Sequence, residues 1–89
     1  MLPPDNIILN RTTSSLPEQY DAFDLQHRLI GFLRIRHGVF TVEAPDIGGT
    51  VVYMAKVSEC SCCFADNERI EFLAKARVAL SEFYTAKKR

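Results

Sequence analysis

The sequence predicts a single small α+β domain with an N-terminal helix, a two- or three-stranded antiparallel sheet and a long amphipathic C-terminal helix. Three observations lead to this prediction. The chain has only 89 residues, β-branched and aromatic residues gather in its middle, and apolar residues recur at helical spacing towards its end. A chain of this length has room for one hydrophobic core. We expect an extended arm over residues 1–14 and the α+β domain over residues 15–89.

The N-terminal helix is predicted from a capping pattern followed by a stripe. Ser15 and Glu18 have the spacing of a capping box, in which each side chain binds a backbone N–H at the start of a helix. Pro17 is tolerated in such a first turn. Mostly apolar side chains then recur at steps of four and three, the period of one helical stripe. They are Leu16, Tyr20, Phe23, His27 and Ile30.

Residues 29–36 fit two interpretations. As strands, residues 33–36 and 39–42 flank a two-residue turn at His37 and Gly38, with their apolar side chains on one face. As a helix, leucines at every fourth position form a ladder that Gly38 would cap. We favour strands because three strands support a small domain better than two. The expected cross-strand pairs are Ile35 with Phe40 and Leu33 with Val42.

The last part of the chain predicts a strand and then the long helix. Residues 50–57 are rich in β-branched and aromatic side chains, which are typical of strands. Asp66 suits an N-cap, and Glu68 suits the amino end of the helix dipole. The residues that share one side of the helical projection are Phe72, Leu73, Ala76, Leu80, Phe83 and Tyr84.

Charge and cysteine content narrow the function classes. Eleven basic and eleven acidic residues balance, which argues against strong non-specific attraction to nucleic acid. The start of the chain lacks the features of a signal peptide, and no window approaches the ~20 apolar residues of a membrane span. Three clustered cysteines do not form a disulfide framework. We therefore expect a cytoplasmic protein with no membrane partner.

No motif in the sequence predicts catalysis. Gly48 and Gly49 lack the fingerprint of a phosphate-binding loop, and acidic residues three apart on predicted helices are typical of a solvated surface. We expect no enzyme activity and no cofactor. A minor alternative is a zinc site at Cys60, Cys62 and Cys63, completed by a histidine. Structural zinc sites usually space their cysteines as C-x₂₋₄-C pairs, so packing of small thiols explains this cluster more simply.

Two kinds of binding surface remain. In the strand interpretation Arg34 and Arg36 share one face and His37 lies at the turn, so this small basic face could bind nucleic-acid phosphates. The preferred function is a protein-interaction module or regulator that binds another protein or itself, for example as a homodimer. Its candidate surface consists of apolar residues outside the predicted core, which are Val39, Val52, Met54, Ile70 and Val78.

Overall fold

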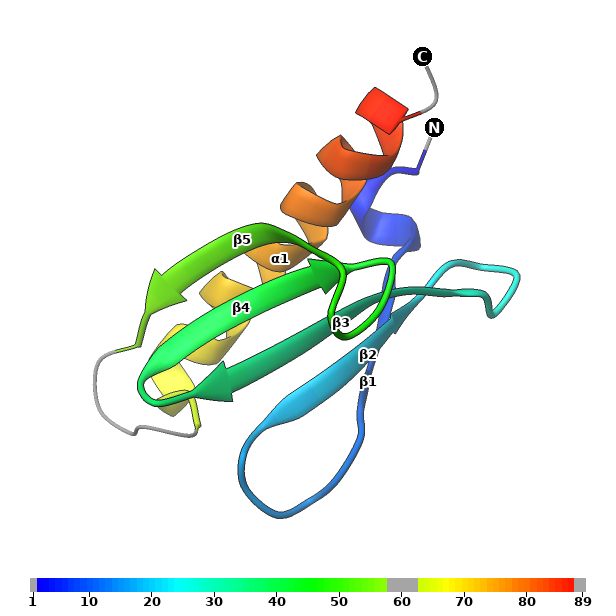
Figure 1. Ribbon diagram of the computed structural model, residues 1–89. Helices are drawn as coiled ribbons and strands as arrows, with labels where there is room; N and C mark the ends of the chain where they lie inside the picture. Colours follow the sequence, from blue (N-terminus) through cyan, green and yellow to red (C-terminus); the bar gives the residue numbers. More distant parts are fainter. Residues whose placement is uncertain (1, 58–62, 88–89) are drawn as a thin grey trace.

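Within residues 2–57 and 63–87, which the computed structural model describes, the chain forms one antiparallel sheet and one long helix (Figure 1). The strands follow each other in the sheet in chain order, and the helix lies across one face, behind the sheet in Figure 1. The fold is therefore α+β in two layers. The elements are the 3-10 helix η1 (Pro4–Asn6), the strands β1 (Ile8–Arg11), β2 (Gln19–Phe23), β3 (Leu29–Arg36), β4 (Val39–Ala44) and β5 (Thr50–Lys56), and the helix α1 (Asp66–Lys87).

The predicted N-terminal helix is wrong, because this segment contributes β2 to the sheet. Tyr20 and Ala22 are buried while the residues between and beside them are half-buried, so the period of burial is two. The expected helical stripe breaks up: Leu16 is exposed, and His27 lies in a turn with a φ of 62°. The strand has backbone hydrogen-bonding partners on both sides, because β2 pairs with β1 and with β3.

The predicted sheet of two or three strands is too small, since β1 and β2 were not expected. β1 pairs antiparallel with β2 and places Ile8 opposite Phe23. Ile7, directly before β1, is buried in the hydrophobic core. Residues 4–11, which belong to the segment predicted as an extended arm, thus contain η1 and β1.

The predicted hairpin around His37 and Gly38 is confirmed. Both turn residues have positive φ values, 53° and 76°, as a type I′ turn requires. The strand interpretation of residues 29–36 therefore holds, and the helix alternative is wrong. The predicted cross-strand pairs are also confirmed: Ile35 lies opposite Phe40 and Leu33 opposite Val42.

α1 is capped one residue earlier than the sequence predicts. The Ala65 N–H donates to Glu68 Oε1 at 3.0 Å, and the backbone N–H groups of Glu68 and Arg69 donate to the Ala65 carbonyl. Ala65 is therefore the N-cap, with one half of a capping box. Asp66, expected as the N-cap, is the first residue of the helix, where its charge suits the helix dipole.

The core lies between α1 and the inner face of the sheet. Ala76 and Leu80 of α1 are completely buried against β3 and β4. Gly31 allows the two layers to approach closely, because a Cβ atom there would lie 2.8 Å from Leu80 Cδ2 and the leucine would have to shift. Phe64 extends the core beyond the helix start, stacked on Phe72 with ring centroids 5.5 Å apart. The predicted core face of the helix is confirmed by the contacts of Phe72, Leu73, Phe83 and Tyr84 with the core cluster.

A buried carboxylate ties the start of α1 to β2. Glu18, directly before β2, is 0% exposed. Arg69 grips it with two hydrogen bonds, Nε to Oε2 at 2.8 Å and Nη2 to Oε1 at 3.0 Å. The Tyr20 hydroxyl and the Phe64 N–H also donate to this carboxylate. Residues 51 positions apart in the chain are thereby fixed to each other.

These contacts keep Glu18 ionised. Burial alone would raise the pKa of its carboxyl, but hydrogen bonds from Arg69, Tyr20 and the Phe64 N–H outweigh burial and lower that pKa to about 2. The pKa of Tyr20 rises to about 12, because burial and the adjacent carboxylate both disfavour the phenolate. The pKa of Arg69 is raised by its hydrogen bonds to Glu18 and Asp66. The pair therefore stays charged throughout the physiological pH range.

We expect Glu18→Gln to lower the free energy of unfolding by about 3 kcal/mol, because it leaves the Arg69 charge without its buried partner. Urea unfolding followed by circular dichroism measures this loss. Asp66→Asn is the matched control, since Asp66 binds the same guanidinium at 2.7 Å from a side chain that is 99% exposed. Its loss should stay within about 1 kcal/mol. Equal losses in the two variants would contradict a special role for the buried carboxylate.

The same carboxylate predicts how stability depends on pH. The pKa of Glu18 is lower in the folded chain than its ordinary value of 4.5, so its contribution is fully present above pH 4.5. That contribution is lost as the pH falls from 4.5 towards 2, and it amounts to about 3 kcal/mol. Unfolding free energies of the wild type and of Glu18→Gln, measured from pH 7 to pH 2, should converge across this window. A pH-independent difference would refute the assignment.

Candidate protein-binding site

β5 is the edge strand at one end of the sheet, and no other described strand pairs with its outer side (Figure 1). The Val57 N–H donates to the Gly38 carbonyl at 3.0 Å. Successive residues of an antiparallel strand direct their backbone groups alternately to the two sides. Val57 and Ala55 therefore face β4, whereas Met54 and Lys56 direct their N–H and C=O groups towards the open side. An edge of this kind can accept another strand.

A groove of about 350 Å³ runs between β5 and α1. Its walls are mostly apolar, with Lys75 and Glu82 as its charged members. Lys75 is held at 2.9 Å by Glu71, one helical turn earlier, and its pKa is raised by this hydrogen bond. The residues that line the groove are Val52, Tyr53, Ala74, Lys75, Val78, Ala79 and Glu82.

A β-bulge places Val52 at this groove. Val42 lies opposite Tyr53 and Glu43 opposite Val51, so Val52 is an extra residue in β5. Its half-buried side chain packs against the core cluster and lines the groove beside α1. Uninterrupted alternation along residues 50–57 would place Val52 on the outer face of the sheet, which is why the sequence predicts it outside the core. The structure puts it on the helix side.

Two of the five predicted protein-binding residues lie in the groove. Val52 and Val78 line the groove, and Val78 is 45% exposed. Val39 and Met54 lie in neighbouring strands on the outer face of the sheet, on the side away from buried Phe40 and half-buried Ala55. Ile70 is 81% exposed near the start of α1 and does not line the groove. The predicted residues therefore form separate surfaces.

The three residues of the predicted basic face differ in how far their side chains are exposed to solvent. Arg34 Nη2 lies 3.8 Å from Glu43 Oε2, and its guanidinium stands over the ring of Phe32, 5.6 Å from the centroid. The Arg34 side chain is only 20% exposed, so its charge is engaged within the sheet. Arg36 and His37 are exposed. The nucleic-acid interpretation draws mainly on these two residues.

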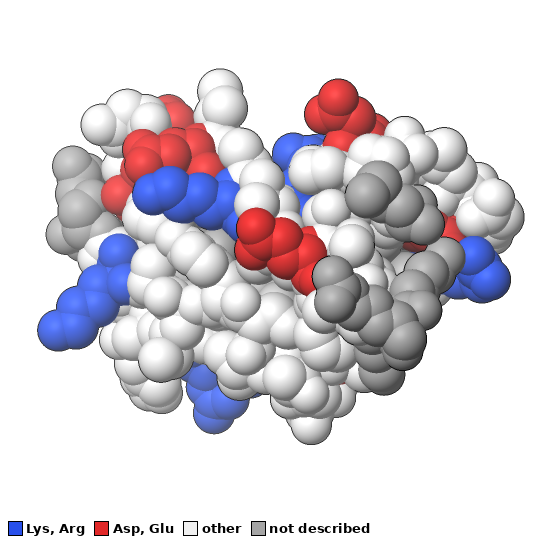
Figure 2. Space-filling model, turned by 90° about the horizontal axis from the view of Figure 1, so that it is seen from above, with Lys and Arg blue, Asp and Glu red and all other residues white. Residues whose placement is uncertain are grey.

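The surface seen in Figure 2 carries basic and acidic side chains close to each other, with uncharged atoms between them. A surface that binds nucleic acid through phosphate contacts usually presents an extended cationic patch or stripe. On this face the charges are interspersed, as the equal numbers of acidic and basic residues in the sequence suggest.

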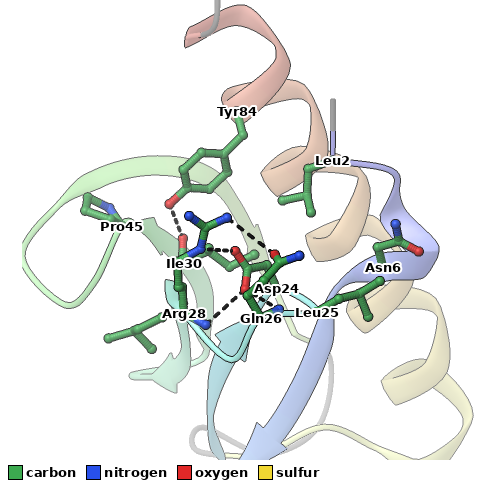
Figure 3. A pocket seen from close by; sticks show the side chains of 10 residues that line it. Leu2, Asn6, Asp24, Leu25, Gln26, Arg28, Ile30, Pro45 and Tyr84 are labelled. Atoms are coloured by element: carbon green, nitrogen blue, oxygen red, sulfur yellow. Dashed lines mark hydrogen bonds and ion pairs between the residues drawn. The ribbon is translucent and has the colours of Figure 1, made fainter.

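A larger cleft, of about 590 Å³, opens where η1, the β2–β3 turn and the end of α1 meet (Figure 3). Its charged residues bind each other: Arg28 Nε donates to Asp24 Oδ2 at 2.7 Å. Asp24 also accepts the backbone N–H groups of Gln26 and Arg28, and these contacts lower its pKa. Tyr84 donates its hydroxyl to the Ile30 carbonyl across the cleft. These polar groups hold the turn and the helix end in place.

The cysteine cluster lies largely outside the described residues. Cys60 and Cys62 are not described, and Cys63 is half-buried next to Phe64. His27 and His37, the candidate fourth ligands, are both exposed turn residues. Within the described part of the chain, no three His, Cys, Asp or Glu side chains are grouped as metal ligands would be. Over the same residues, no helix combines the length and the apolar character needed to cross a membrane.

Sequence reasoning missed most of the groove. In the sequence Lys75 and Glu82 are ordinary charged residues of a helix surface, and no pattern marks them as lining a groove. Ala74 and Ala79 carry no signal in the sequence, because a small residue on a helix is equally compatible with exposure and with a partner. The β-branched segment of β5 was the one usable signal, since an edge position follows once the strand order is known.

Comparison of the chain with models of protein families, with curated proteins and with solved structures found no match.

Proposed function

We propose that this protein is a non-catalytic protein-interaction module that binds an extended segment of its partner along β5. The observation that carries the proposal is the combination of an open edge strand with an apolar groove directly beside it. Strand addition uses the backbone of the edge for affinity and neighbouring side-chain sites for specificity. Both parts are present within one surface, which consists of β5 and one side of α1.

The backbone part is supplied by the outward-directed groups of Met54 and Lys56. Each offers one donor and one acceptor that β4 leaves unused, and an added antiparallel strand would pair with both residues. Exposed side chains extend the apolar area on the outer face, because Val51 is 52% and Met54 65% exposed. An edge with this apolar character favours a protein strand over water.

The groove supports selection of the partner's side chains. Residues of an added strand alternate between the two faces of the sheet, so every second side chain would point to the groove. Its apolar walls at Val52, Val78 and Ala79 favour apolar side chains there. The partner we propose is an extended segment with apolar residues at alternate positions. The odd number of clustered cysteines supports the accompanying proposal of a reducing, cytoplasmic compartment.

We expect Met54→Pro to abolish binding of extended peptides and Met54→Ala to preserve it. Proline removes an N–H that points to the open edge and costs no hydrogen bond to β4, whereas alanine keeps the N–H. The measurement is selection from a displayed library of peptides with alternating apolar residues, on sparsely immobilised protein. Fluorescence anisotropy of the selected peptides then compares the variants. Selected peptides that bind Met54→Pro as tightly as they bind Met54→Ala would overturn the proposal.

A second pair of variants tests the groove separately from the edge. Val78→Glu puts a charge into the groove and should weaken binding of the selected peptides at least ~tenfold. Ile70→Glu makes the same change on the same helix, at a residue outside the groove, and should leave binding unchanged. Urea unfolding of both variants checks that the fold is retained. Equal weakening by the two substitutions would show that the groove does not contact the peptide.

A further inference from the structure

The two charged residues beside the groove are arranged so that two antiparallel copies of the helix would place opposite charges next to each other. Lys75 and Glu82 both line the groove from α1, seven residues apart and so two turns apart on one side of the helix. Between them the helix presents Val78 and Ala79. A second helix placed alongside in the opposite direction, centred on these residues, would bring its Glu82 to Lys75 and its Lys75 to Glu82. Opposite charges would then meet at both ends of the contact.

Pairing of two copies along the edge of β5 would relate them by the same antiparallel arrangement. Antiparallel pairing of β5 with a second β5 is generated by a two-fold axis perpendicular to the sheet. This axis also reverses the direction of α1 relative to its counterpart in the helix layer. Met54 is an outward-directed residue, so it can exchange both backbone hydrogen bonds with Met54 of the second copy. One operation therefore satisfies the strand edge and aligns the charges of the helices.

We propose that the partner bound along β5 is a second copy of this chain, in a two-fold dimer with one continuous sheet and antiparallel α1 helices. This inference rests on the proposed function and names the occupant of the same site. Three features of one surface carry it: the outward backbone groups of Met54 and Lys56, which pair with no other described strand, the apolar groove, and the Lys75–Glu82 order. The dimer removes the exposed edge and covers Met54, which is 65% exposed in the single chain.

The test is a charge-exchange cycle at Lys75 and Glu82, followed by sedimentation equilibrium of the whole chain. The wild type should show a concentration-dependent dimer. Lys75→Glu and Glu82→Lys each place like charges opposite one another twice, so each should weaken the dimer about tenfold. The double variant exchanges the charges and should restore wild-type dimerisation. Added salt should weaken the wild-type dimer and strengthen the single variants relative to it.

The double variant also separates the dimer contact from the internal pair. Lys75→Glu loses its contact with Glu71 in the same chain, and Glu82→Lys cannot restore that contact. Recovery of the dimer in the double variant therefore reports on the contact between copies. A wild type that stays monomeric, or a double variant that does not recover, overturns the inference. Dimerisation that persists in Met54→Pro overturns it too.

The outcomes distinguish this inference from the proposed function. A monomeric chain whose selected peptides still require the Met54 N–H would overturn only the second copy as the partner. A chain that enriches no peptide over Met54→Pro, and whose dimer is indifferent to that substitution, would overturn strand binding at β5 altogether.

Discussion

The contact between Glu18 and Arg69 joins the two layers at the point where α1 begins. A carboxylate without access to solvent is costly to ionise, and here Arg69, Tyr20 and the Phe64 N–H offset that cost together. Because the donors come from β2, from Phe64 just before α1 and from the first turn of α1, the position of the helix start relative to the sheet is fixed. From that start α1 runs across the inner face, and its residues between Ala74 and Glu82 border the groove beside β5.

Because of this course of α1, the two edge strands of the sheet differ in how closely the helix contacts them. At the β1 end, Arg77 of α1 donates to the Ile7 carbonyl at 3.2 Å, so the helix is linked to the segment that leads into the edge strand. At the β5 end, α1 leaves a groove beside the strand. An open edge is a hazard for aggregation unless it is short, charged or covered. β5 has seven residues, with apolar side chains on both faces. A protein strand paired along β5 would cover this exposed edge and so remove the hazard.

The sheet and the helix therefore contribute different properties to one surface. The strand edge supplies directional hydrogen bonds that any extended chain can use, whatever its sequence. In the proposed binding mode the groove supplies the selectivity, since its apolar walls favour apolar side chains of the partner. The proposed dimer adds the charges of α1, which discriminate between antiparallel and parallel arrangements of the helices.

The sequence by itself determined the elements whose reasons are local. Alternating apolar residues and two positions that tolerate positive φ specify the β3–β4 hairpin, and helical periodicity specifies α1. Only the tertiary structure decided that residues 19–23 form the strand β2. Ser15 and Glu18 fit the start of a helix equally well, and it is Arg69, 51 residues after Glu18, that binds the Glu18 carboxylate and fixes it before the strand. Likewise the bulge at Val52 and the course of α1 decided that Val78 lines a groove and Ile70 does not. Such features depend on contacts between distant residues, and no local pattern encodes them.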